Sequence, residues 1–392
     1  MKRLSPVIRV VPFRDAAGPV NETQTRVFPL AGVLTFVAMV SIGCALSPPE
    51  EPVTRNDHGR PRPSCYRTYG DDGDDVNKRI PIPEPQLALG MSAEWHEPES
   101  LGTPVNTKCL EDAIQISPCG QQLYFMYTED LLSELGGAML SFPNGTYVAT
   151  RTGGPAEFSH PTFYELGLGV DLSLDGKPIF TPDGSQVYFH SNRADNLGNS
   201  PEYTDYLDMY VAPLIDGVPG VARNLGPPVN SVYPDGEAEL HPDGVTLYFA
   251  SLRPGPEPKE YQGGPGKGNL WRSTWNGSAW SDPEFLPFPI NRPASEQKQP
   301  AFVTHDGTLY MYFVSDHLVA FYTGLGWIRD SAIYRSTVSE SGDLGVPELV
   351  IRGIVGEPSL TADGRYLYFV HVLYGAAGGF GSDIWYVRRK QE

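Results

Sequence analysis

The sequence predicts an all-β protein, a five-bladed β-propeller with four antiparallel strands in each blade. Three observations predict it. Gly 42 and Pro 38 together make about a fifth of the 392 residues, a share that favours many turns over long helices. One strand–turn–strand pattern recurs five times. The repeats are about 60 residues apart, which is the length that four short strands and their turns require.

The recurring pattern is a short strand, a turn of the Pro-Asp-Gly type and a second strand with Leu-Tyr-Phe. Asp-Gly between two apolar runs is a strong hairpin signal, because both residues tolerate a positive φ. The five copies lie at 116–125, 180–189, 240–249, 303–311 and 360–369. Five copies in register predict five blades. A sixth blade would have to lie in 128–178, where the spacing leaves little room.

Each interval between repeats also contains a third and a fourth strand. The fourth strand is clearest at 280–286, where the sequence is Trp-Ser-Asp-Pro-Glu-Phe-Leu. Third strands are predicted at 208–210, 269–271, 332–334 and 383–385, with a weaker copy at 138–140.

The two ends of the repeat region complement each other. After the fifth turn only residues 364–392 remain, which is too short for a full blade. Upstream, 95–101 matches the fourth-strand sequence at 280–286. We therefore expect the N-terminal strand to complete the last blade and close the ring, which removes an open sheet edge.

A leader is predicted at 1–44. Five basic residues in 1–26 precede an uncharged stretch at 27–43, as in a secretory signal. The ending Val-Ser-Ile-Gly before Cys44 resembles a bacterial lipobox, which implies lipidation of Cys44. The alternative is an uncleaved anchor helix, since 17 residues are at the lower limit for spanning a bilayer. Both interpretations predict an exported protein at the bacterial cell envelope, on the periplasmic face or the cell surface, attached to the membrane through this segment only.

Residues 45–87 are rich in Pro and charged residues and lack apolar periodicity, so a disordered linker is predicted there. The propeller domain then occupies 88–392. The acidic run at 71–75 lacks the alternating spacing of a calcium-binding loop. No metal or cofactor is predicted.

In an oxidising compartment the cysteines beyond the leader can pair. Cys109 and Cys119 flank an extended strand about 33 Å long, too far apart to be bridged. The sequence therefore predicts a Cys65–Cys119 or a Cys65–Cys109 disulfide.

Composition and missing motifs exclude several functions. Lys+Arg 29 against Asp+Glu 47 gives a net charge of −18, which argues against binding to nucleic acid. The chain has no Gly-x-Ser-x-Gly elbow and no His-Glu-x-x-His motif, so serine-hydrolase and zinc-protease chemistry are not indicated. The glycine-rich segment 263–268 lacks the spacing of a phosphate-binding loop.

One repeat position gathers polar residues. Aligned on the turns, the residue that begins each innermost strand is Ala113, Lys177, Glu237, Gln299 or Glu357, and Asp112 precedes the first of them. Because innermost strands surround the central channel, we interpret Asp112, Lys177, Glu237, Gln299 and Glu357 as a ligand-binding ring. The alternative is a structural role, in which these residues hydrogen-bond strand ends and channel water.

The pattern Pro-Asp-Gly-x-x-Leu-Tyr-Phe-x-Ser-x-Arg, fullest at 242–253 and 182–193, resembles the repeat of TolB-type β-propellers. The segment Gly-Ser-Asp-Ile-Trp at 381–385 resembles another part of that repeat. The resemblance covers nearly all of 88–392 and departs locally at Cys119 and at His305-Asp306. It implies an exported binding or scaffold module. The main prediction is thus non-catalytic recognition of an envelope protein, a peptide or a glycan, with an enzyme less favoured.

A glycoside hydrolase or a carbohydrate-binding protein is the alternative. Five-bladed propellers include glycosidases, which use one carboxyl group as a general acid and another as a base or nucleophile. Asp112, Glu237 and Glu357 are the candidates, since they come from different blades and can face one another. A third interpretation is a scaffold that docks another protein on one propeller face.

Overall fold

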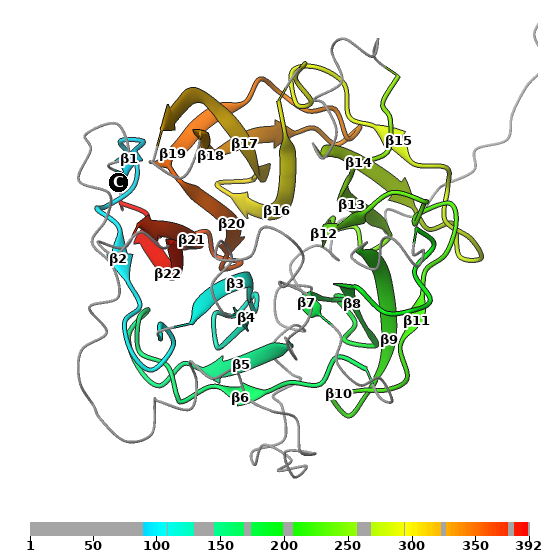
Figure 1. Cartoon of the computed structure of the whole chain (residues 1–392), viewed down its shortest axis with the longest axis horizontal. Helices are drawn as coiled ribbons and strands as arrows, with labels where there is room; N and C mark the ends of the chain where they lie inside the picture. The colour runs from blue at the N-terminus through cyan, green and yellow to red at the C-terminus, as the bar shows by residue number, and fades with distance from the viewer. Residues whose placement is uncertain are drawn as a thin grey trace, which may run out of the picture. The chain divides into compact units, whose positions relative to one another are not determined.

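The structure, a computed structural model, describes residues 89–107, 109–128, 145–167, 174–198, 207–256, 268–293, 295–322, 327–374 and 380–390. These residues form five antiparallel sheets that surround a common centre, with β3, β7, β12, β16 and β20 innermost (Figure 1). The predicted five-bladed β-propeller is confirmed. Among the described residues no helix is long and apolar enough to cross a bilayer.

The first three blades follow one another along the chain. Blade I contains β3 (Leu110–Ile116), β4 (Gln122–Thr128), β5 (Thr146–Thr150) and β6 (Thr162–Phe163). Blade II contains β7 (Asp175–Phe180), β8 (Gln186–Ser191), β9 (Asp208–Ile215), β10 (Val218–Pro219) and β11 (Arg223–Asn224). Blade III contains β12 (Asp235–Leu240), β13 (Thr246–Ser251), β14 (Asn269–Thr274) and β15 (Glu284–Phe285).

The last two blades each receive a strand from the N-terminal part of the chain. Blade IV contains β16 (Gln297–His305), β17 (Thr308–Tyr322), β18 (Trp327–Val338), β19 (Glu348–Gly353) and β1 (Gly90–Met91). Blade V contains β20 (Val355–Leu360), β21 (Tyr366–Tyr374), β22 (Phe380–Arg388) and β2 (Glu99–Ser100).

The ring closes as predicted, because β2 pairs with β22 as the outer strand of blade V. β1 pairs with β19, so the same N-terminal segment also extends blade IV. Between these two strands the Glu94 carboxylate accepts hydrogen bonds from Arg335 in blade IV and from Arg389 after blade V, at 2.9 and 2.8 Å. The N-terminal segment therefore ties the last two blades together.

Three sequence predictions concern segments outside the described residues. The third strand of blade I is β5, not the predicted 138–140, which lies outside the described residues. The weaker copy was a wrong choice because Thr146–Thr150 carries the alternating burial of a strand. The leader at 1–44 and the linker at 45–87 also lie outside the described residues and stay predictions.

The core lies between neighbouring blades. The Leu and Phe of the Leu-Tyr-Phe segments are fully buried and pack against the adjacent blade: Leu123, Phe125, Leu247, Phe249, Leu367 and Phe369. Each repeat thus supplies one half of an interface, and burial of these side chains holds neighbouring blades together.

Three asparagines form a second repeat that the sequence analysis missed. Asn106, Asn230 and Asn291 follow the outer strand of one blade and lie before the innermost strand of the next. The Asn230 side chain accepts from Met209 N at 2.8 Å and donates to Met209 O at 2.9 Å. Asn106 pairs in this way with Ile384, and Asn291 with Leu270. The blade-to-blade connections are therefore fixed to the third strands.

Candidate active site at the channel mouth

The innermost strand of every blade is bulged at the same position. The pairing register between the first and second strands shifts there in all five blades. One residue in each bulge has a positive φ, between 48° and 56°: Ala113, Lys177, Glu237, Gln299 and Glu357. These are the five residues that the turn alignment selected. A bulge changes the direction in which a side chain points. Non-glycine residues with a positive φ are found at functional sites more often than elsewhere.

In three of the five blades, a glycine directly precedes the residue with positive φ. A Cβ on Gly176 would lie 2.7 Å from His190 Nε2, and one on Gly356 would lie 3.1 Å from Gln299 Oε1. Neighbouring side chains therefore occupy this space. At the same level, blades I and IV carry Asp112 and Lys298 instead of glycine.

Gln299 connects two of the predicted acids. Its Nε2 donates to Glu237 Oε1 at 3.0 Å and also to Glu357 Oε1. Its Oε1 accepts the Glu357 backbone N–H at 3.0 Å. Because both carboxylate oxygens lie within hydrogen-bonding reach of one nitrogen, they are no more than about 6 Å apart. Gln299 therefore holds the carboxyl groups of blades III and V in a fixed relation.

Lys177 and Glu357 form a loose, buried ion pair. Lys177 Nζ lies 3.6 Å from Glu357 Oε2, and the side chains are 1% and 4% exposed. Neither of these two atoms has a hydrogen-bond partner in the described part of the chain. Burial raises the pKa of Glu357 to about 8; Lys177 opposes this shift, and Glu237 and Asp112 add to it. Glu357 therefore holds a proton at neutral pH more readily than a free glutamic acid.

Asp112 and Lys298 belong to the same electrostatic network. Burial raises the pKa of Asp112; the Ala113 N–H opposes that shift, and the Glu237 charge reinforces it. Burial alone would lower the pKa of Lys298, but Glu237, Glu296, Glu357 and Asp112 together raise it. The Lys298 side chain is 32% exposed and makes a 3.7 Å ion pair with Glu296. Lys298 is thus a charged, partly accessible ammonium beside the acids.

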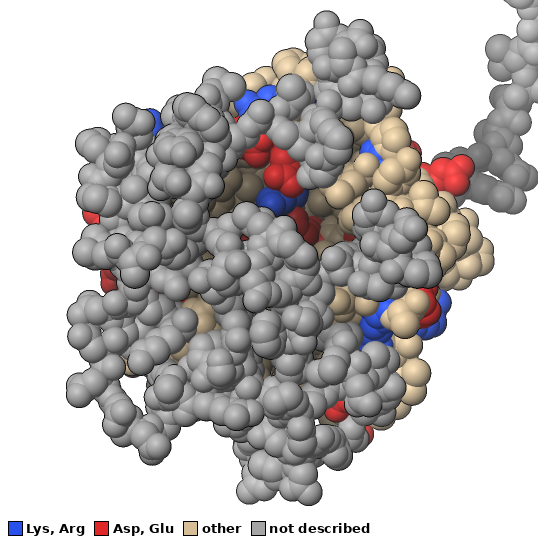
Figure 2. Space-filling model, in the orientation of Figure 1, with Lys and Arg blue, Asp and Glu red and all other residues tan. Residues whose placement is uncertain are grey.

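The centre of one face is hollowed. Figure 2 shows acidic and basic side chains together inside this hollow. Figure 1 shows the innermost strands around the same centre. The contacts and charge interactions described above bring the five predicted site residues together, with Asp112 and Glu237 half-buried and Lys177, Gln299 and Glu357 buried.

His190 was missed by the sequence analysis as part of this site. It is buried, and its Nδ1 accepts the backbone N–H of Glu237 at 3.2 Å. Burial lowers the pKa of His190 to about 4, so the ring is neutral and can accept this bond. A signal existed in the sequence, because the positions equivalent to His190 in the other blades carry apolar residues: Met126, Ala250, Val314 and Val370.

A second polar level lies two residues beyond the bulges and was also missed. Gln115 Nε2 donates to Glu239 Oε2 at 3.2 Å, across from blade I to blade III. Burial raises the pKa of Glu239 to about 7, against the opposing charge of Lys177. The polar interior therefore continues below the channel mouth.

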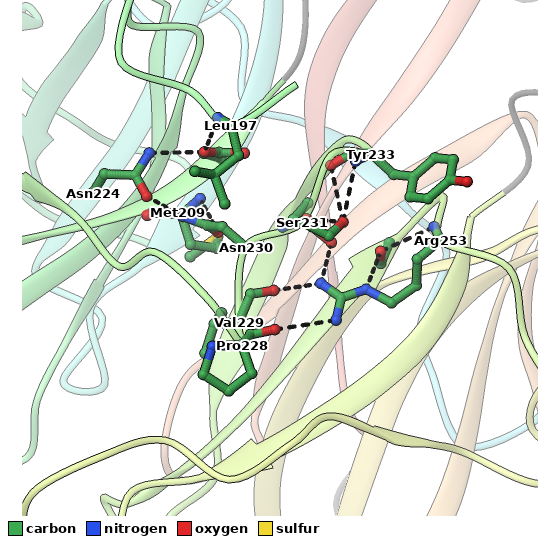
Figure 3. Close-up of polar contacts among 12 residues, drawn as sticks. Leu197, Met209, Asn224, Pro228, Val229, Asn230, Ser231, Tyr233 and Arg253 are labelled. Carbon is green, nitrogen blue, oxygen red and sulfur yellow. Dashed lines mark hydrogen bonds and ion pairs between the residues drawn. The ribbon is translucent and has the colours of Figure 1, made fainter. Parts of the chain in front are cut away.

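The Ser-x-Arg part of the repeat builds a clamp behind the site. In Figure 3 the Arg253 guanidinium donates to the carbonyl oxygens of Pro228 and Val229. It also donates to Asp235 Oδ1 at 2.6 Å and to Ser251 Oγ at 2.8 Å. In blade II, Arg193 makes the equivalent pair with Asp175, at 2.7 and 3.2 Å. Each clamp fixes the residue two positions before a bulge.

The cysteines settle one prediction. Cys109 is disulfide-bonded, and its partner lies outside the described residues. Cys119 is free, so of the two predicted pairings Cys65–Cys119 is excluded, and Cys65–Cys109 stays a prediction because Cys65 lies outside the described residues. The described residues contain no group of three or more His, Cys, Asp or Glu side chains that could hold a metal ion.

No family model and no curated protein matches the chain. Solved structures resemble it in fold. A thermostable family-43 glycoside hydrolase is 13% identical, with 74% of this chain and 93% of that chain covered and a TM-score of 0.48. An α-L-arabinofuranosidase from Podospora anserina in complex with cellotriose is 10% identical, with 75% and 95% covered and a TM-score of 0.43. An α-L-arabinofuranosidase from Lactobacillus brevis is 14% identical, with 70% and 90% covered and a TM-score of 0.41.

These structures correct two predictions. The resemblance to TolB-type proteins is supported only as far as the β-propeller fold. The prediction of a non-catalytic, TolB-like binding module is wrong, because the three structures named above are glycoside hydrolases, as in the alternative prediction. The location at the cell envelope stays a prediction. At such low identity the likeness is one of fold, so the chemistry has to be argued from the residues of the site.

Proposed function

We propose that the protein is a glycoside hydrolase that works at the channel mouth. The observation that carries this proposal is the convergence of three acids from blades I, III and V, two of which have raised pKa values. Glycosidic bond cleavage needs one carboxyl group that keeps a proton and another that acts as a base or a nucleophile. Different environments around neighbouring acids supply these two states.

Asp112 and Glu237 are the pair assigned to contact substrate, because both side chains are half-buried at the mouth. Burial and the Glu237 charge raise the pKa of Asp112, as suits a general acid. Glu237 Oε1 accepts a hydrogen bond from Gln299, and Lys298 lies nearby, so its surroundings suit a carboxylate. Asp112 is therefore assigned as the proton donor and Glu237 as the base or nucleophile.

Glu357 is assigned a supporting role. Its side chain is only 4% exposed and is held by Gln299 and Lys177. It cannot touch a sugar without moving, so we treat Glu357 as a positioning residue for Glu237. This assignment narrows the predicted set of three acids to two that contact substrate.

The reaction balances with these groups and water. The Asp112 proton passes to the glycosidic oxygen as the bond from that oxygen to the anomeric carbon breaks. Water adds to the anomeric carbon and gives up one proton, either directly to Glu237 or, after a covalent Glu237–sugar intermediate, back to Asp112. The anomeric configuration of the first product, read by NMR, separates the two routes.

The first test is release of 4-nitrophenol from aryl glycosides, with the α-L-arabinofuranoside and the β-D-xyloside as the starting pair. We expect hydrolysis by the unaltered protein and a fall in kcat/KM of about 10²–10⁴-fold in E237Q, the size expected for loss of a base or nucleophile. D112N should show a fall of this size on the corresponding disaccharide, whose leaving oxygen needs the Asp112 proton, and a smaller fall on the aryl glycoside, since 4-nitrophenolate leaves unprotonated. Neither substitution should lower the Tm. A pH profile should place the alkaline limb of kcat/KM above the usual range of an aspartic acid, because Asp112 must stay protonated.

The matched control is Glu284→Gln on the outer strand of blade III, where the side chain is exposed and pairs with Arg272. It should keep full activity. Absence of hydrolysis across a broad panel of aryl glycosides and polysaccharides would overturn the proposal. So would an E237Q variant that remains within twofold of the unaltered protein on the aryl glycoside, together with a D112N variant that does so on the disaccharide.

A further inference from the structure

An exposed aromatic residue lies just before the strand that carries Glu237. Tyr233 is 41% exposed, and β12 begins two residues later. Glu237 is four residues further along the chain, so the two residues are at most about 13 Å apart along an extended backbone. Tyr233 therefore lies on the side of the propeller where the innermost strand begins, close to the proposed base or nucleophile.

The turn that carries Tyr233 is held firmly. Asp235 Oδ2 accepts from Ser231 N at 2.6 Å and from Ser231 Oγ at 2.7 Å. Ser231 Oγ in turn accepts the Tyr233 N–H at 3.1 Å. On the other side, Pro234 O accepts the Leu252 N–H at 3.0 Å. The Asp235–Arg253 clamp thus anchors both ends of this short turn.

The phenol ring of Tyr233 takes no part in these hydrogen bonds. In Figure 3 the Tyr233 side chain points away from the Ser231 hydroxyl and from the Arg253 guanidinium. Among the described residues it packs against no other aromatic ring, and its hydroxyl makes no hydrogen bond. An aromatic side chain on a fixed backbone has few rotatable bonds to lose on binding, so it gives contact area at a small entropic cost.

We infer that Tyr233 is a stacking platform for a sugar ring of an oligosaccharide that extends outward from the channel mouth. The inference rests on the proposed function for the identity of its ligand. The apolar C–H face of a sugar ring fits an exposed phenol ring, and the hydroxyl groups of both can stay in water. Tyr233 lies on the turn before β12, outside the bulge that holds Glu237, so in this proposal the platform meets a sugar unit next to the one that Glu237 contacts. The substrate class is therefore a glycan chain rather than a single glycoside.

The test compares a long and a short substrate in the full chain. The short probe is the aryl glycoside cleaved in the panel, and the long probe is α-1,5-arabinotetraose for the arabinofuranoside or xylotetraose for the xyloside. In Y233A we expect the ratio of kcat/KM for the long probe to that for the short probe to fall about tenfold, the value of one aromatic contact. The conservative Y233F should restore the ratio. Val232→Ala, at the adjacent exposed position, should leave it unchanged.

Binding measured by calorimetry on E237Q, with the same tetraoses, separates this inference from the proposed function. If the unaltered protein hydrolyses the aryl glycoside but Y233A keeps the wild-type ratio, the stacking role of Tyr233 is refuted and the hydrolase activity is retained. If no glycoside is hydrolysed, yet a tetraose binds and Y233A lowers its affinity about tenfold, the stacking role of Tyr233 is retained and the hydrolase activity is refuted. If no glycoside is hydrolysed and neither tetraose binds, both are overturned.

Discussion

Two ion pairs of this molecule involve residues of the innermost strands, Asp235–Arg253 and Lys177–Glu357. They differ in the number of hydrogen bonds that their charged atoms make. Arg253 lies 2.6 Å from Asp235, donates to three further oxygens and stacks over the rings of Phe249 and Trp271. Lys177 lies 3.6 Å from Glu357, and the two facing atoms have no hydrogen bond in the described part of the chain.

This difference distinguishes charged groups that stabilise the fold from charged groups that can gain or lose a proton. Buried polar atoms in native proteins are nearly always hydrogen-bonded, and exceptions call for an explanation. The clamp pairs its buried carboxylate with a cation and with hydroxyl donors; burial raises the pKa of Asp235, and the Arg253 charge opposes that shift. The channel mouth leaves atoms unsatisfied and raises the pKa of Glu357 to about 8. Such a site can bind a ligand or exchange a proton under ordinary conditions.

The largest effect is expected from breaking the clamp. Arg253→Met removes the guanidinium and leaves the Asp235 side chain, which is 0% exposed, without its cation. Removing one partner of a buried pair costs about 3–5 kcal/mol. Urea unfolding at pH 7 should show this loss in the free energy of unfolding.

An exposed ion pair gives the matched control for the clamp. Arg365 and Asp363 are 3.7 Å apart and 64% and 52% exposed. Arg365→Met should therefore cost less than about 1 kcal/mol. If R253M and R365M proved equally mild, the clamp would not be the stabilising element that its contacts indicate.

A smaller, pH-dependent effect is expected at the loose pair. The pKa of Glu357 is raised to about 8 in the folded chain from 4.5, so the folded state holds a proton that the unfolded state has already lost. The stability that this group contributes is complete below pH 4.5 and falls as the pH rises toward 8. Glu357→Gln should remove about 3.5 kcal/mol of that fall between pH 5 and pH 8, at about 1.36 kcal/mol for each pH unit over which only the folded state keeps the proton. Unfolding free energies measured at several pH values test this.

The comparison for E357Q is Glu284→Gln, which removes an exposed carboxylate and should leave the pH dependence of the unaltered protein in place. A wild-type slope in E357Q would show that Glu357 titrates normally, and the contrast between the clamp and the mouth would then disappear.

Repetition made most of the fold predictable. Five turns in register gave the blade number, and the match between 95–101 and 280–286 gave the ring closure by β2. The weak point was blade I, where the third strand is β5 and the chosen copy at 138–140 was wrong. A single strand without its partners carries too little pattern to be placed, because strand position is set by pairing.

The grouping of the candidate residues around the channel was predictable from the sequence, and their contacts were less so. Counting back from the turns found Lys177, Glu237, Gln299 and Glu357, because the same bulge recurs in every blade. The count could not show that Gln299 joins two acids, since that contact runs between blades and depends on side-chain direction. The Ser-x-Arg motif was noted only as a family feature, yet it forms the clamps, because its Arg reaches an Asp on the adjacent strand.

The smallest expected effect concerns His190, which links the clamped scaffold to the titrating mouth. Burial lowers the pKa of His190 to about 4 from 6.5, so the unfolded chain binds a proton that the folded chain refuses. The stability that this group contributes is therefore complete above pH 6.5 and falls as the pH drops toward 4. His190→Asn cannot titrate but can still accept the Glu237 N–H. It should remove about 1 kcal/mol of stability loss between pH 6.5 and pH 5.5. The control is His96→Asn, at a half-buried position between β1 and β2 and away from the channel mouth, which should leave that loss in place. If H190N kept the acid loss of the unaltered protein, the neutral ring beside Glu237 would not be what couples this site to the fold.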